Sequence, residues 1–111
     1  MMSSSDSFIA VEYCDDIETE RCDEIAVVIF GIAPNVEPKL HKLAGWLKIA
    51  ARLSLEELDL ISSILNEIVS RIKLSPGNVF GMRQFENTIR IQGPFPAEKF
   101  HANYKSRILS Q

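Results

Sequence analysis

The sequence predicts an α+β fold, in which a small antiparallel or mixed sheet packs against a central two-helix hairpin and a C-terminal helix closes the domain. Two apolar segments in the first third of the chain have the composition of strands, and two stretches in the middle repeat apolar residues at helical spacing. The chain has 111 residues, which is the length of one domain, and its 46% hydrophobic content is enough to build a core without cross-links.

The N-terminal strands are predicted from alternation and from β-branched composition. Residues 1–7 are small and polar, so we expect a disordered tail there and a single globular domain over residues 8–111. Phe8–Tyr13 alternates between two faces and predicts a strand, while Ile25–Ala33 is nearly all apolar and predicts a strand buried on both faces. The acidic segment Asp15–Glu24 between them fits either a loop or one to two turns of helix.

The central helices are predicted from apolar residues three and four positions apart. Such residues form one wide stripe over Lys39–Leu53. Gly45 lies within this stretch at a cost to helix stability, which indicates that a neighbouring element packs closely against that turn. The second helix begins at the capping box Ser54–Glu57 and runs to about Lys73. Its apolar seam repeats at spacings of 3, 4, 3 and 4, which is the pattern of helix pairing.

The last third of the chain is predicted to contain a turn, an extended segment and a helix. Proline and glycine mark a turn at Ser75–Asn78. Val79–Gln92 then fits either one long strand or a hairpin that turns near Glu86-Asn87. The closing helix is expected to begin near Pro96, because proline is favoured in the first turn of a helix.

Charge is unevenly distributed along the chain. Residues 1–37 hold nine acidic residues and one basic residue, whereas residues 38–111 hold eleven basic and six acidic residues. The two fields either partly cancel in the fold, or the basic part offers an anion-binding surface. Basic residues among phenylalanines suit single-stranded nucleic acid, although the overall pI of 5.3 does not. The candidate contacts with nucleic acid or another anion are Arg83, Arg90, Lys99, Lys105 and Arg107.

No motif in the sequence indicates catalysis or metal binding. Cys14 and Cys22 lie eight residues apart and lack a second pair, so we interpret them as small apolar fillers or chance neighbours rather than as zinc ligands or a disulfide framework. His41 and His101 each stand alone, and no phosphate-binding loop is present. We therefore expect no cofactor, no metal and no catalytic residue, and an enzyme is the less favoured class.

The second helix carries the main functional hypothesis. Its apolar surface is wide, so either the first helix and the sheet cover all of it, or a second copy or another protein covers the rest. We expect a small non-enzymatic regulatory or adaptor protein that acts through protein–protein interaction, as a homodimer. The candidate interface residues share the apolar seam of this helix: Leu58, Ile61, Ile64, Leu65, Ile68 and Ile72.

Two alternatives remain open. The first is a nucleic-acid-binding regulator that uses the basic C-terminal region. The second is a small-ligand-binding protein or small enzyme, with Trp46, Tyr104 and His101 lining a pocket. No apolar run approaches the roughly 20 residues needed to span a bilayer, and no secretory signal is recognised, so we expect a cytoplasmic protein without membrane contact.

Overall fold

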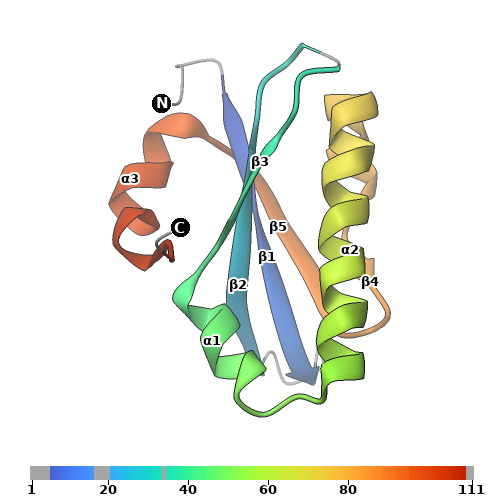
Figure 1. Cartoon of the computed structure of the whole chain (residues 1–111). Coiled ribbons are helices and arrows are strands. Elements are labelled where there is room, and N and C mark those ends of the chain that lie inside the picture. The colour runs from blue at the N-terminus through green and yellow to red at the C-terminus, as the bar shows by residue number, and fades with distance from the viewer. Residues whose placement is uncertain (1–5, 17–20, 34, 110–111) are drawn as a thin grey trace.

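A computed structural model of the chain contains a five-stranded antiparallel sheet with helices on both faces (Figure 1). The structure describes residues 6–16, 21–33 and 35–109. The predicted α+β class is thus confirmed, and the sheet is antiparallel rather than mixed, with strand order β3-β2-β1-β5-β4. The strands are β1 Ser7–Asp16, β2 Arg21–Phe30, β3 Lys39–Lys42, β4 Gln84–Phe85 and β5 Ile89–Pro96.

The helical elements are unequal in length. The longest is α2, Leu55–Leu74, which runs along one face of the sheet, while α3 lies on the opposite side (Figure 1). The remaining α-helices are α1 Ala44–Ala50 and α3 Phe100–Asn103, and the 3₁₀ turns are η1 Pro76–Gly81, η2 Ala97–Lys99 and η3 Lys105–Arg107.

The hydrophobic core has two parts because the strands bury side chains on both faces. On the α2 side, Ile9 and Val11 of β1 pack with buried residues of α2 such as Ile68. On the α3 side, Phe8 and Ala10 of the same strand pack with residues that include Val27, Phe100 and Tyr104. Successive residues of a strand point to opposite faces, so one strand supplies both clusters.

The first two predicted strands are present and begin earlier than expected, but β2 ends at Phe30. The prediction of a buried strand is therefore wrong for residues 31–33, where Ile32 is exposed. β1 begins at Ser7, which the sequence places in the tail, and the carbonyl of Asp6 just before it accepts from the N–H of Ala97. Residues 1–5 lie outside the described residues. Asp15, Asp16 and Arg21–Glu24 belong to strands, because β1 and β2 continue to pair beyond the apolar segments. The sequence predicts a loop or a short helix for the acidic segment, and both predictions are wrong at its two ends, which are strands. Residues 17–20, between these ends, lie outside the described part.

The predicted helix over Lys39–Leu53 is wrong in its first turn. Lys39–Lys42 forms β3, which pairs with Ala26–Ile29 along the outer side of β2. A buried strand needs partners for its backbone groups on both sides, and this requirement overrides the helical spacing of the side chains. The helix starts only at Ala44 and packs against β2, so the long two-helix hairpin is not formed.

The second helix is confirmed together with its capping box. The backbone N–H of Glu57 donates to Ser54 Oγ at 3.2 Å, and the N–H of Ser54 donates to Glu57 Oε1 at 3.1 Å. Each end of this reciprocal pair satisfies a donor that the first helical turn leaves free.

Of the two alternatives for Val79–Gln92, one long strand or a hairpin, the structure contains the hairpin, formed by β4 and β5. Glu86 and Asn87 have φ values of 51° and 58°, and Thr88 N–H donates to the carbonyl of Phe85 at 3.1 Å. Positive φ at both central residues is the signature of a type I′ turn, which joins antiparallel strands tightly. Residues 79–81, which the sequence places in the extended segment, instead form part of η1.

The closing helix is present but is broken into η2, α3 and η3. Its position is set by aromatic packing, since the Phe8 ring lies 5.4 Å from the Phe100 ring and 5.3 Å from the Tyr104 ring, both edge-on. Edge-to-face pairs add to the area that such rings bury.

We expect Gly45→Ala to lower the free energy of unfolding by about 2 kcal/mol, because a Cβ at this position would meet the backbone carbonyl of Glu24, which has little freedom to move. Gly81→Ala is the matched control, since a Cβ there meets nothing within 4 Å and should change stability by less than about 0.5 kcal/mol. Urea unfolding of both variants measures the difference. Equal stabilities would show that α1 does not approach β2 as closely as described.

Candidate functional site

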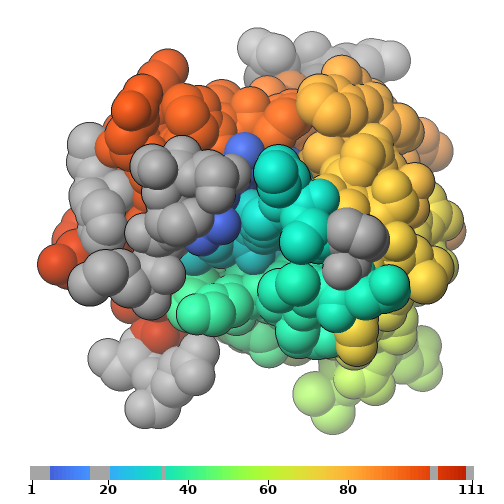
Figure 2. All heavy atoms as spheres, turned by 90° about the horizontal axis from the view of Figure 1, so that it is seen from above, coloured from blue at the N-terminus to red at the C-terminus, as the bar shows by residue number. Residues whose placement is uncertain are grey.

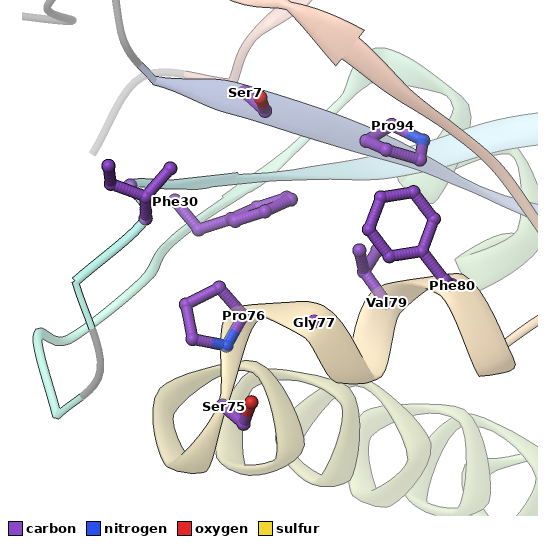
Figure 3. A pocket seen from close by; sticks show the side chains of 10 residues that line it. Ser7, Phe30, Ser75, Pro76, Gly77, Val79, Phe80 and Pro94 are labelled. Atoms are coloured by element: carbon purple, nitrogen blue, oxygen red, sulfur yellow. The ribbon is translucent and has the colours of Figure 1, made fainter.

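A pocket of about 380 Å³ lies at the end of the molecule where β2 and α2 both finish. Figure 3 shows Phe30 from β2, Pro94 from β5 and Phe80 from η1 around it. Its lining contains no charged side chain and consists of Ser7, Phe30, Gly31, Ile32, Ser75, Pro76, Gly77, Val79, Phe80 and Pro94. Such a lining suits an uncharged, largely apolar group.

Two contacts hold the segment after β2 against the end of α2. The backbone N–H of Asn35 donates to the carbonyl of Lys73 at 2.8 Å, and Lys73 Nζ lies 2.9 Å from a carboxylate oxygen of Glu37. The first contact satisfies a carbonyl in the last turn of α2, where no intrahelical donor remains. The pocket thus lies where the segment after β2, bonded to the last turn of α2, meets the end of the sheet.

Large apolar side chains are exposed in the segment after β2, at the end of α2 and in η1. Ile32, Val36, Leu74 and Phe80 are 80%, 58%, 71% and 63% exposed, and they are four of the seven large hydrophobic residues that are exposed in the described part of the chain. Figure 2 views this end from above, with the segment after β2 beside the end of α2. We call these four residues and the pocket the apolar end surface.

Sequence reasoning does not identify this surface, because it predicts Ile32 and Phe80 to lie in extended structure, within Ile25–Ala33 and Val79–Gln92. A local signal was present: Ile32 and Phe80 are large apolar residues within or beside stretches rich in glycine and proline. Connecting segments usually carry polar residues, so a phenylalanine or isoleucine there indicates either a hidden contact or an interaction site.

The predicted interface residues do not form an exposed seam. Five of them lie in the core between α2 and the sheet, and Leu58 is partly buried against that core. This corrects the site prediction, because the sheet of the same chain covers the side chains that were assigned to a partner. The buried five are Ile61, Ile64, Leu65, Ile68 and Ile72.

Two of the five candidate anion contacts are paired with acidic residues of the N-terminal strands. Arg90 Nε lies 2.9 Å from Glu12 Oε1, and the side-chain amide of Gln92 donates to the same oxygen at 3.2 Å. Arg107 Nη2 lies 2.9 Å from Glu24 Oε1. For these residues, the fold brings the acidic N-terminal part and the basic C-terminal part of the chain together. This agrees with the interpretation in which the opposite charges of the two parts partly cancel.

These pairs form a polar row across the sheet. Glu12 and Glu24 are direct partners in the β1–β2 register, so two carboxylates stand opposite each other and each needs its own donors. The Tyr104 hydroxyl donates to Glu24 Oε2 at 2.7 Å, and burial together with this carboxylate raises the pKa of Tyr104 well above its usual value. The row therefore has the character of a satisfied network rather than a free anion site.

The other three candidate cations are exposed. Arg83 donates to the carbonyl of Gly93 at 3.4 Å and lines a shallow polar recess with Gln84 and Arg90, while Lys99 and Lys105 lie in the C-terminal segment. Only part of the predicted basic surface is thus available to an anion.

The residues suggested for a ligand pocket do not converge. Trp46 packs against the core on the α2 side of the sheet, whereas Tyr104 belongs to the core on the opposite side. The side chain of His101 lies outside the described part of the structure. The sheet separates Trp46 from Tyr104, so the predicted site is wrong as a single pocket.

The cysteines form a disulfide between β1 and β2, which corrects their interpretation as unbonded fillers. Cys14 and Cys22 are direct partners in the strand register, a relation that eight intervening residues in the sequence did not reveal. Extracellular and periplasmic proteins commonly keep such bonds, whereas cytosolic disulfides are usually transient. The bond therefore weakens the expectation of a permanently reduced, cytoplasmic chain.

Comparisons with protein-family models, with curated proteins and with solved structures find no match for this chain. Among the described helices, none is both long and apolar enough to cross a membrane.

We expect Glu12→Leu to lower the free energy of unfolding by about 1–3 kcal/mol, because it leaves the partly buried Arg90 without its carboxylate. Glu67→Gln is the matched control: it removes an exposed pair with Arg71 on α2 and should cost less than about 0.5 kcal/mol. Chemical denaturation of both variants compares the losses. Similar losses would contradict the central place of Glu12 in the polar row.

We expect stability to depend on the protonation of His41. Its Nδ1 atom is buried and lacks a hydrogen-bond partner among the described residues, and burial, with Lys39 nearby, lowers its pKa below the usual 6.5. As the pH falls below about 6.5, the unfolded chain binds the proton first, so the free energy of unfolding falls until the lower folded-state pKa is passed.

Urea unfolding between pH 7.5 and 5 measures this dependence, and His41→Gln is the comparison that retains His101. The variant should lose less stability over this range than the wild-type chain. Identical pH profiles would mean that His41 titrates alike in both states.

Proposed function

We propose that this chain is a small non-enzymatic adaptor that binds another protein through the apolar end surface. The observation that carries the proposal is an uncharged pocket whose lining includes the exposed Ile32 and Phe80, with exposed Val36 and Leu74 in the adjoining segments of the chain. Large apolar side chains exposed at the edge of an uncharged pocket are costly to leave in water and often mark a protein-binding site. The adaptor class agrees with the expectation from sequence, but the proposed contact moves from the seam of α2 to its C-terminal end.

The pocket suits a side chain that anchors a partner. Protein interfaces commonly concentrate their binding energy in a few large side chains that fill well-packed pockets, with neighbouring contacts excluding water. Here the pocket would receive an apolar side chain of the partner, and Ile32 and Phe80 would cover its edges. A second copy of this chain is one such partner, and homodimer formation remains part of the proposal.

Ile32→Asp tests the proposal, with Leu55→Asp as its matched control. Both leucine and isoleucine are 80% exposed, but Leu55 lies at the first turn of α2, at the other end of the helix. An aspartate at either site should leave the fold intact, and at Ile32 it should weaken partner binding at least about tenfold, since it brings a charge into an apolar contact.

Two measurements read the effect. Light scattering after size exclusion reports whether the chain dimerises, and quantitative capture from the native cell reports other partners. The proposal requires a dimer or a captured protein that wild type and Leu55→Asp bind equally and that Ile32→Asp loses. If all three proteins are monomers and capture the same set, the end surface is not a binding site.

A further inference from the structure

The disulfide lies where β1 ends and β2 begins, close to charged residues of both strands. Cys14 is fully buried, whereas Cys22 is partly exposed and is the more accessible of the two to a thiol in solution. Each cysteine is followed by an aspartate, so Asp15 and Asp23 lie beside the bond on neighbouring strands.

One arginine spans both aspartates. Arg52 Nη1 lies 2.9 and 3.0 Å from the two carboxylate oxygens of Asp15, and its Nη2 lies 3.2 Å from Asp23 Oδ2. A guanidinium presents its donors in a rigid planar fork, which allows one side chain to bind two carboxylates. Arg52 stands in the connection between α1 and α2, two residues before the capping residue Ser54.

The disulfide and Arg52 therefore act on the same strand ends. Both ion pairs are exposed, with 43% of the Arg52 side chain accessible, and exposed pairs are weak because long side chains lose freedom when they are held in one geometry. The disulfide reduces that loss, since it keeps the backbones that carry Asp15 and Asp23 together. Without the bond, only the β1–β2 ladder holds the two carboxylates together, and the end of a ladder opens locally more readily than its middle.

We propose that Cys14–Cys22 is a redox-responsive clamp. When oxidised, it ties the ends of β1 and β2 through Arg52 to the α1–α2 connection, and when reduced it releases that connection. The clamp lies at the start of α2 and the apolar end surface lies beyond its other end, so the two proposals rest on different residues (Figure 1).

The reductant is a dithiol. Its first thiolate attacks Sγ of Cys22, the Cys14–Cys22 bond breaks, and Cys14 leaves as a thiolate that takes up a proton. The second thiol of the reductant then attacks the mixed disulfide and releases Cys22. Two electrons pass to the protein, which gains two thiols, while the reductant becomes a disulfide.

Amide hydrogen exchange of the intact chain, measured with and without dithiothreitol under conditions where the chain stays folded, tests the clamp. We expect reduction to raise exchange at least about threefold at residues 21–24 and at residues 51–58, because both segments lose tethers to local opening. Exchange at residues 64–72 in the core should not change. Alkylation with iodoacetamide before reduction should label neither cysteine.

Arg52→Gln separates the two halves of the clamp, with Arg71→Gln as a control that removes an exposed ion pair on α2. In Arg52→Gln, reduction should still affect residues 21–24 but no longer residues 51–58, whereas Arg71→Gln should respond as the wild type does. A Cys14→Ser, Cys22→Ser variant should ignore dithiothreitol. Labelling of both cysteines before reduction, an unchanged exchange at 51–58 in the wild type, or a wild-type response in Arg52→Gln would each overturn the proposal.

Discussion

The burial of β1 on both of its faces is the constraint on which the rest of the structure depends. It is the middle strand of the sheet, with β2 on one side and β5 on the other, and Phe8, Ile9, Ala10 and Val11 are all essentially inaccessible to water. Because neighbouring residues of a strand point to opposite faces, both α2 and the C-terminal segment must dock on this one strand. A shift of one residue in its register would exchange the contents of the two cores.

The same alternation explains the polar row. Glu12 lies on the face of β1 that the C-terminal segment covers, but it carries a carboxylate instead of an apolar side chain. Its direct partner on β2 is Glu24. Two carboxylates that face each other need donors from elsewhere, and these come from Arg90 in β5 and from Tyr104 and Arg107 after it. The basic surplus of the later part of the chain is thus partly used within the fold, which leaves a smaller surface for nucleic acid than the sequence suggests.

The two ends of the sheet differ in chemistry because different segments close them. One end is held by the disulfide and by the ion pairs of Arg52 with Asp15 and Asp23, which join the strands to the start of α2. At the other end the strands and α2 finish in segments that leave Ile32 and Phe80 exposed. Binding and redox response, as proposed, are therefore separated by the length of α2.

By itself, the sequence determined the features that depend on neighbouring residues. The capping box at Ser54, the seam of α2 and the alternation of β1 are all local, and a short window of sequence contains the physical reasons for each. The Glu86-Asn87 turn was one of two alternatives that the sequence left open. Only the tertiary structure decided the features that join distant segments. Lys39–Lys42 is a strand because β2 needs a partner, Cys14 meets Cys22 through the strand register, and Arg90 finds Glu12 across the sheet. The apolar end surface depends on where α2 ends relative to β2, and helical or strand periodicity carries no information about that meeting.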